Sequence, residues 1–475
     1  MLGREPSLND DEDLVAPRGV EAPRSAGSGR DVVPFSEAVR VWFAISLQTF
    51  GGPAGQIAVM QHALVDQKRW IGQRRFLHAL SFCTLLPGPE AQQLAIYIGW
   101  LLNGTRGGLV AGSLFVLPGM VAFMALSAVY VVWGQSTIVA ALFAGLAPAV
   151  LAIVAHAVVR VSKRAFGHPA LLGVGVAAFL ALSVFAVPFP IVLAAAAAAG
   201  LGLGRWAPST MRVADVGEAA DSEPPLIADD ALHSEQPSWG HAAKVLGIGL
   251  FAWAVPIGAV VILTGTHSVF TQQGVFFSGA AVVTFGGAYA VLAYVAQRAV
   301  EVYGWLSPVE MVRGLALAET TPGPLIMVVQ YVAFLGAYRH PGSMNPWVAA
   351  VVAALLTTWV TFVPCFIFIF LGAPSVEKLR GNQAISNALR GVTAAVVGVI
   401  ANLGLYFAVH TLFSQVRTQA WGPLRLQVPH LDSLRPAAVV IAGVAAVLLF
   451  RHRWSVLRTL GVCAALGLVA AFIPV

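Results

Sequence analysis

Charged side chains are scarce in this sequence. Asp, Glu, Lys and Arg make up 11% of its 475 residues, whereas 58% are hydrophobic. Soluble domains carry about 25% charged residues, so the composition excludes a soluble enzyme. The formal net charge of +6 is small for this length and lies mostly in loops. It therefore indicates membrane topology rather than nucleic-acid binding, and lipid is the expected surrounding of much of the surface.

Cysteines and cofactor motifs are also few. Cys83, Cys365 and Cys463 stand in separate apolar stretches without CxxC spacing, so we expect packing residues rather than metal ligands or a disulfide. The sequence has no P-loop, no dinucleotide-binding glycine turn and no His/Cys cluster. These absences predict a protein that is not an enzyme, binds no cofactor and does not hydrolyse ATP.

Long apolar stretches dominate what is present. Four uncharged or nearly uncharged segments have about 20 residues each, the length that crosses a hydrocarbon core of roughly 30 Å. They are residues 109–133, 138–159, 349–371 and 388–409. The sequence therefore predicts an all-α polytopic membrane protein.

The two hydrophobic blocks of the chain repeat one another. Three landmarks recur at one offset of 235 residues: Thr-Phe-Gly-Gly at 49–52 and 284–287, Trp70 and Trp305, and Pro-Gly-Pro at 87–89 and 322–324. After an insertion, Pro118 pairs with Pro364 at an offset of 246. A fixed offset over several landmarks indicates duplication.

Polar stretches set the expected domain limits. Residues 1–34 lack an apolar core and predict a disordered cytoplasmic tail rather than a signal peptide. The acidic stretch 205–240 predicts a polar cytoplasmic linker. We therefore expect an N-terminal repeat at 35–204, a C-terminal repeat at 241–410, and a loop with C-terminal transmembrane helices at 411–475.

Loop charges predict that the halves have inverted topology. In the first half, 66–75 and 159–168 are basic and should face the cytoplasm, whereas 134–137 is uncharged. The second half reverses this pattern, because 298–313 balances arginines against acids while 372–390 is net basic. Inverted repeats are a recurring plan of secondary transporters, whose substrate lies near the midplane where the repeats meet.

The repeated motifs should break helices at membrane depth. Segments 76–86 and 92–103 are too short to span a bilayer, and Pro-Gly-Pro separates them. Because proline lacks an amide hydrogen and disfavours a helical residue before it, Leu86 should end one helix and Pro89 should begin the next. The same reasoning predicts further helix starts near Pro53, near Ala288 and at Pro324.

Broken or re-entrant helices predict a binding site. Irregular backbone survives in a bilayer where protein or a water-filled cavity satisfies its polar groups. Each new helix start presents free amides and about half a positive charge, which suits an anion. Close helix packing is the competing interpretation of any single glycine motif, but repetition of the whole pattern favours a site. The predicted substrate-binding residues are Phe50, Gly51, Gly52, Pro53, Gln56, Pro87, Gly88, Pro89, Glu90, Gln93, Phe285, Gly286, Gly287, Glu319, Thr320, Thr321, Pro322, Gly323 and Pro324.

Each polar residue at the breaks can be interpreted as functional or as structural. Glu90 and Glu319 should sit at membrane depth, where acids are functional by default, unless either one caps a half-helix or pairs with Arg313. Gln and Thr side chains near the breaks offer neutral hydrogen bonds suited to a tetrahedral oxyanion; they are Gln56, Thr84, Gln92, Gln93, Thr320 and Thr321. Arg75 and Arg106 are candidates for attracting an anion, with topology anchors as the alternative.

A family resemblance rests on three of these motifs. Phe-Gly-Gly-Pro at 50–53, Leu-Pro-Gly-Pro-Glu-Ala-x-Gln-Leu-Ala-x-Tyr-x-Gly at 86–99 and Thr-Thr-Pro-Gly-Pro at 320–324 together resemble the chromate ion transporter family in its long, two-domain form. The resemblance covers nearly all of residues 36–410. It implies a multi-pass protein of the bacterial plasma (inner) membrane that is associated with chromate efflux. The cytoplasmic N-terminus is expected from the loop charges.

The expected function is secondary export of chromate, driven by the membrane potential and, as one option, by proton exchange, which confers chromate resistance. The alternatives are a transporter of sulfate or another oxyanion, an anion channel, or a membrane scaffold that binds no oxyanion. The expected partners are a chromate- or sulfate-like oxyanion and the lipid bilayer, without nucleic acid. A homodimer stands beside a monomer as an option.

Overall fold

The computed structural model is built almost wholly of helices, and it describes residues 31–50, 52–207, 226, 238–285, 288–373, 382–422 and 424–471. The first half contains α1 (Phe35–Ser46), α2 (Gly52–Gln61), the π-helical turn η1 (His62–Gln67), α3 (Gln73–Cys83), α4 (Glu90–Trp133), α5 (Thr137–Ala165), α6 (Pro169–Ser183) and α7 (Phe189–Trp206). The expected tail at 1–34 lies outside the described residues up to residue 30, and the expected linker does so from 208 to 237 apart from Leu226.

The second half starts with one helix that has no counterpart among the described residues of the first. Its elements are α8 (Trp239–Thr264), α9 (Val269–Val282), α10 (Ala288–Gln297), η3 (Arg298–Val302), α11 (Pro308–Thr320), the 3₁₀ turn η4 (Leu325–Met327), α12 (Val328–Arg339), α13 (Pro346–Gly372), α15 (Gln383–Leu412), β1 (Val416–Trp421), β2 (Leu424–Pro429), η6 (Leu431–Ser433), α16 (Pro436–Ala446), η7 (Val447–Arg451) and α17 (Val456–Ala471).

The order of elements repeats along the chain. The run α1, α2, η1, α3 recurs as α9, α10, η3, α11, and α5 recurs as α15. The long α4 corresponds to α12 and α13 together. It is itself broken, because Asn103 and Gly104 leave the helical region, where the second half has a loop between Arg339 and Pro346. Helices α6 and α7 correspond in order to α16 and α17, after the β1–β2 hairpin.

Backbone hydrogen bonds preserve the register of the repeat. The amide of Trp70 donates to the carbonyl of Leu64 at 2.9 Å, and that of Trp305 donates to Ala299 at 2.8 Å. Both bonds close a π-helical turn before a buried tryptophan. The offset of 235 that the sequence predicts therefore holds in the backbone as well.

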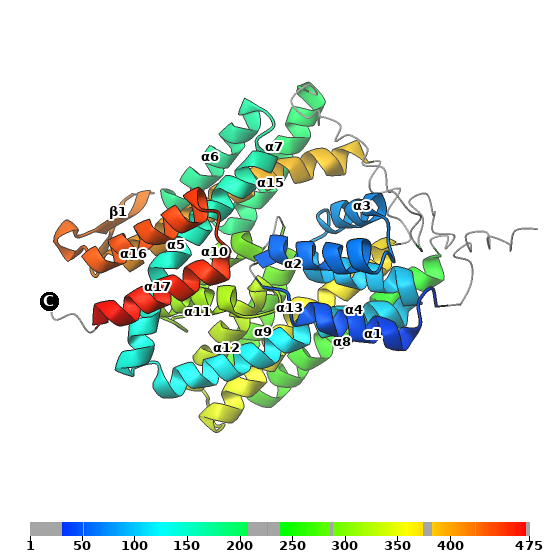
Figure 1. Cartoon of the computed structure of the whole chain (residues 1–475), viewed down its shortest axis with the longest axis horizontal. Helices are drawn as coiled ribbons and strands as arrows, with labels where there is room; N and C mark the ends of the chain where they lie inside the picture. The colour runs from blue at the N-terminus through cyan, green and yellow to red at the C-terminus, as the bar shows by residue number, and fades with distance from the viewer. Residues whose placement is uncertain are drawn as a thin grey trace, which may run out of the picture.

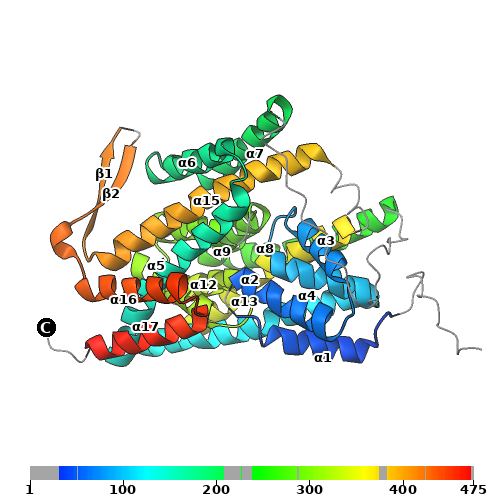
Figure 2. The same cartoon turned by 45° about the horizontal axis from the view of Figure 1, so that its top comes forward.

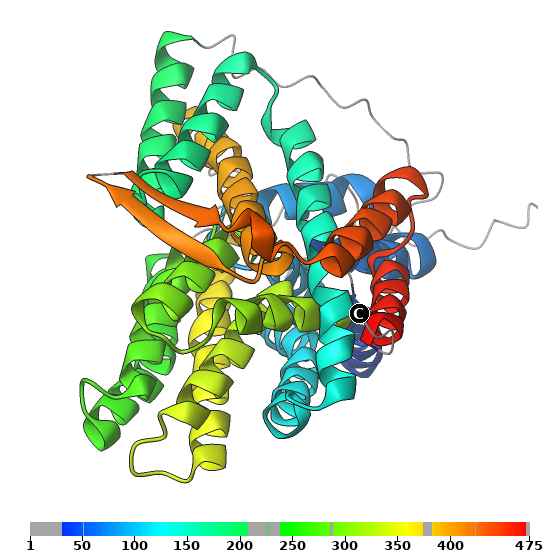
Figure 3. The same cartoon turned by 90° about the vertical axis from the view of Figure 1, so that its left-hand side faces the viewer.

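Within the described part of the chain, six helices are long and apolar enough to cross a membrane, namely α4, α5, α7, α8, α13 and α15. Helix α15 packs against α5, α6 and α7, and Figure 1 shows these four elements together. Figure 3 shows α6 and α7 side by side above the rest of the bundle. The antiparallel β1–β2 hairpin stands at the edge of the molecule, away from α1 and α3 (Figure 2). The chain is a multi-pass helical membrane protein.

Helix α8 lies on the outside of this bundle. None of its residues is buried, and it is held to α13 by two reciprocal bonds. The Trp253 indole donates to the Val360 carbonyl at 3.0 Å, and the Trp359 indole donates to Ala252 at 2.8 Å. Its remaining apolar surface is left for lipid.

Short broken helices occupy the interior. Helix α12 has 12 residues, and every residue from Val328 to Ala337 is buried. A helix of that length rises about 18 Å and cannot cross a hydrocarbon core alone. Its apolar surface is covered by α13, α4, α11 and α9 instead of lipid. The breaks therefore lie inside protein, as irregular backbone in a membrane requires.

Candidate functional site at the junctions of the broken helices

The site begins where the Thr-Phe-Gly-Gly segment of one half meets the Pro-Gly-Pro turn of the other. The amide of Gly323 donates to the carbonyl of Thr49 at 2.9 Å. The buried Gln56 amide group donates to the carbonyl of Gly323 at 2.6 Å. We name this contact, formed by Thr49, Gly52 and Gln56 with Glu319 and Gly323, the first junction.

The second junction joins the same two motifs with the halves exchanged. The amide of Gly88 donates to the carbonyl of Thr284 at 2.7 Å, and the Gln93 side chain donates to the carbonyl of Pro87 at 2.7 Å. Gly88 and Thr284 are the repeat counterparts of Gly323 and Thr49. Each half therefore contributes its turn to the start of a helix in the other, which is a two-fold relation between the halves.

The central glycines of both turns are required by conformation and by space. Gly88 has φ +127° and Gly323 has φ +98°, a region that residues with a Cβ rarely adopt. A Cβ on Gly88 would lie 2.9 Å from the Cys365 sulfur, and one on Gly323 would lie 3.1 Å from the Cα of Gly119. Cys365 and Gly119 are themselves repeat counterparts. The same two glycines therefore allow both the break between helices and the close packing against the other half.

Helix starts fall where the motifs predict them, with small shifts. Helix α2 begins at Gly52, α10 at Ala288 and α4 at Glu90. Pro89 is the N-cap of α4 rather than its first residue, and the helix expected at Pro324 begins as the 3₁₀ turn η4.

The end of the helix before the first Pro-Gly-Pro also differs from the expectation. Helix α3 ends at Cys83 rather than Leu86, because Leu85 and Leu86 bond back to Phe82 and Cys83 in tighter turns. The restriction that proline places on the residue before it therefore unwinds almost a full turn.

Glu319 forms the polar centre of the first junction. Its side chain is 1% exposed and accepts a hydrogen bond of 2.6 Å from the Tyr289 hydroxyl, while its second oxygen has no partner among the described residues. The same hydroxyl is 3.8 Å from the position that a Cβ on Gly52 would take. Tyr289 therefore links the start of α2 to Glu319, three residues before the second Pro-Gly-Pro.

Tyr289 was not among the residues predicted from the sequence. The signal available was a polar aromatic residue placed two positions after Thr-Phe-Gly-Gly in an otherwise apolar segment. The pairing with Arg313 that the sequence leaves open does not occur, because the Arg313 guanidinium donates to the Tyr130 hydroxyl at 3.1 Å.

The other predicted polar residues are placed differently from one another. Glu90 is half-buried in the first turn of α4, where the helix dipole favours a carboxylate. Gln92 is fully buried, and neither its oxygen nor its nitrogen has a partner among the described residues. Thr320 and Thr321 both donate to the carbonyl of Leu317, so their hydroxyl hydrogens point into α11 in this conformation.

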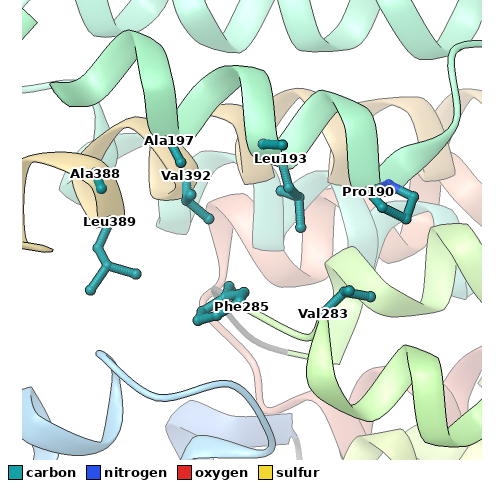
Figure 4. Close-up of a pocket in the computed structure, with 9 residues that line it drawn as sticks. Pro190, Leu193, Ala197, Val283, Phe285, Ala388, Leu389 and Val392 are labelled. Carbon is teal, nitrogen blue, oxygen red and sulfur yellow. The ribbon is translucent and has the colours of Figure 1, made fainter. Parts of the chain in front are cut away.

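Two cavities lie beside the junctions, and each is lined by the phenylalanine of one Thr-Phe-Gly-Gly motif. The first has a volume of about 260 Å³ and an apolar lining, with Phe285 and Val283 facing Leu193 and Pro190 of α7 (Figure 4). The second, of about 360 Å³, is lined by Phe50, Ala54, Gly55, Arg160, Ser455, Val456 and Leu457. Phe50 and Phe285 are the members of the predicted site that line them.

Several predicted positions stand apart from these contacts. Gly51, Gly286 and Gly287 lie outside the described residues. Arg75 is buried beside Tyr97, with 3.5 Å between its guanidinium and the tyrosine hydroxyl, and Arg106 is exposed. Neither arginine lines one of the two cavities.

A duplicated helical membrane protein whose broken helices meet in its interior belongs, by architecture, to the membrane transporters. The comparison with known sequences identifies the family of transporters. The chain belongs to the chromate transporter family, whose sequence pattern matches residues 36–201 and 271–468, more than half of the chain. Members of this family are transporters, not enzymes.

Similar proteins match over most of their length. The chain is 27% identical over 390 residues to the chromate transport protein of Cupriavidus metallidurans, covering 82% of this chain and 86% of that protein. It is 30% identical over 359 residues to the chromate transport protein of Pseudomonas aeruginosa, covering 74% and 76%. It is 27% identical over 352 residues to the probable chromate transport protein of Synechococcus elongatus, covering 74% and 79%. No solved structure matches the chain.

Proposed function

We propose that the protein is a secondary transporter that exports chromate from the cytoplasm and thereby confers chromate resistance. The observation that carries this proposal is the reciprocal pair of bonds, Gly323 to Thr49 and Gly88 to Thr284, which brings helix starts from both halves together in the interior. Helix starts present free amides that favour anions. The relatives named as chromate transport proteins indicate which anion.

The membrane potential suffices as the driving force. An inside-negative potential does work of about 2.3 kcal/mol on each charge per 100 mV, so a divalent anion leaving the cell gains about 4.6 kcal/mol at that potential. Coupling of transport to protons is the further property that we propose to test at Glu90. Sulfate has the same charge and shape as chromate, and it is the alternative substrate.

The proposal includes an inverted arrangement of the halves in the bacterial inner membrane, with the N-terminus in the cytoplasm. It is supported by the reversal of loop charge and by the two-fold relation of the junctions. We further propose that the second repeat, expected at 241–410 from the sequence, instead runs from α9 to α17, because the second family match, 271–468, covers most of both helices. The account holds for a monomer and for a homodimer, since both junctions lie within one chain.

Vesicles with a clamped potential test the transport mode. Inverted membrane vesicles expose the cytoplasmic face, so a lumen-positive potential should accelerate chromate uptake, and the rate should saturate with chromate concentration. Sulfate should compete. Uptake that rises without saturation would indicate a channel, and uptake no faster than in vesicles without the protein would indicate neither function.

A further inference from the structure

The cavity beneath Phe50 is lined by one cationic side chain, that of Arg160. Arg160, near the C-terminal end of α5, lines this cavity together with Ala54 and Gly55 from the first turn of α2 and with residues 455–457 at the start of α17. Its volume of about 360 Å³ lies within the range of roughly 300–1,000 Å³ that is usual for small-molecule sites. The cavity therefore has room for a hydrated oxyanion.

Arg160 is not committed to a structural ion pair. Its guanidinium lies 3.2 Å from Nδ1 of His156, one turn earlier on α5. Among the described residues, no carboxylate lies within salt-bridge distance of it. The cavity adjoins the first junction, because Phe50 directly follows Thr49, and Ala54 and Gly55 follow Gly52 in the first turn of α2. A guanidinium that lines a cavity and is not held in an ion pair is suited to binding an oxyanion.

The second half does not repeat this arrangement. The counterpart of Arg160 on α15 is Tyr406, whose buried hydroxyl has no partner among the described residues. The start of α17 that lines the cavity corresponds to the start of α7, where Pro190 lines an apolar cavity under Phe285. A feature needed only for folding the repeat would be expected in both halves. Among the described residues, a cationic side chain lines the cavity beneath Phe50 and none lines the cavity under Phe285.

We infer that the cavity beneath Phe50 is the docking site for the divalent oxyanion on one side of the pathway, with Arg160 as its binding cation. Ala54 and Gly55 of the first turn of α2 also line the cavity, and the start of a helix carries a positive potential. Arg160 lies at the basic 159–168 end of α5, the end that loop charge assigns to the cytoplasm. The site collects the anion for export. This inference rests on the proposed transport function.

The test compares Arg160→Gln with two reference variants. Arg160→Lys keeps the charge, and Lys163→Gln removes an exposed charge from the same end of α5 without touching the cavity. Chromate uptake into inverted vesicles gives KM and kcat, and equilibrium dialysis of labelled chromate against purified protein gives Kd. Arg160→Gln should raise KM and Kd about tenfold, as loss of one charge-assisted hydrogen bond would. Arg160→Lys should recover most of the affinity, and Lys163→Gln should match the wild type.

A second variant separates the site from a folding effect. Val456→Trp leaves Arg160 in place but fills the cavity from the α17 side, so it should also raise KM while purified protein stays monodisperse. If the wild type transports chromate and Arg160→Gln has the same Kd and KM as the wild type, the docking site is refuted while the proposed function stands. Equal losses of chromate affinity in Arg160→Gln and Lys163→Gln would also refute the docking site, because they would show an effect of general surface charge. Absence of chromate uptake by the wild type would instead refute the proposed function.

Discussion

The backbone amide of Gly88 donates to the carbonyl oxygen of Thr284 over 2.7 Å, although the two residues belong to different halves of the chain. This bond has a counterpart between Gly323 and Thr49. The two motifs that look like separate sequence signatures are therefore two parts of one contact, formed twice. Changes in either motif should affect both halves.

Replacing the turn glycines with residues that have a side chain should stop transport without preventing insertion of the protein into the membrane. Gly88→Leu and Gly323→Leu place a Cβ at positive φ and against Cys365 or Gly119, so the turn must shift and the junction must open. We expect uptake to fall to the level of empty vesicles while membrane content stays near wild type. Gly173→Leu is the matched control, because nothing lies within 4 Å of a Cβ there. Normal transport in Gly88→Leu would leave these glycines as helix packing alone.

The Tyr289 hydroxyl should stabilise the first junction. Tyr289→Phe leaves Glu319 with neither oxygen partnered among the described residues, since its second oxygen already lacks a partner. Loss of a partner by a buried polar group costs about 1–3 kcal/mol. Thermal unfolding in detergent should therefore occur at lower temperature in Tyr289→Phe, and the loss should largely vanish when Glu319→Leu is also present. Additive effects of the two changes would argue against direct coupling.

Glu90 is the residue that we expect to link protons to transport. A charged carboxylate in the first turn of α4 would repel a divalent anion held nearby, so anion and carboxylate charge should not coexist, and a proton should be taken up as the anion binds. Anion flux at fixed potential across a pH series should become nearly independent of pH in Glu90→Gln. A pH profile that superimposes on the wild type would exclude Glu90 as the proton-linked group.

Single-cysteine labelling in intact cells tests the orientation of the halves. Residues 66–75 and 221–230 should be protected as cytoplasmic, and 265–274 should be labelled from outside. The cytoplasmic assignment of 377–380 falls outside the described residues, as does most of 221–230, and it can be tested in the same way. Labelling of 298–307 from the same side as 66–75 would mean that the repeats are parallel.

Much of the fold was predictable because membrane insertion leaves strong local signals. The spans at 109–133, 138–159, 349–371 and 388–409 fall inside α4, α5, α13 and α15. The offset of 235 locates equivalent hydrogen bonds at Trp70 and Trp305. Apolar length and repeated motifs are properties of short windows, and a single sequence therefore contains them.

The pairing of the motifs was not predictable in the same way. Nothing in the sequence near Gly88 indicates that its amide bonds to Thr284, because that contact depends on how two separate halves pack. Tyr289 and Arg160 were missed for the same reason: each lies in an ordinary apolar or basic segment, and only its position against Glu319 or Phe50 makes it notable. The repeat gave no signal for these two residues, because Tyr289 corresponds to Ala54 and Arg160 corresponds to Tyr406 in the other half.

Uptake of chromate by inverted vesicles reconstituted with the purified protein tests the central claim most directly. The cytoplasmic face is outside in these vesicles, so labelled chromate supplied outside should accumulate in the lumen. Uptake should exceed that of protein-free vesicles, saturate with concentration and fall when sulfate is added. Gly88→Leu protein, reconstituted at equal density, should show none of this. Uptake by the wild type that does not exceed that of protein-free vesicles would contradict the account.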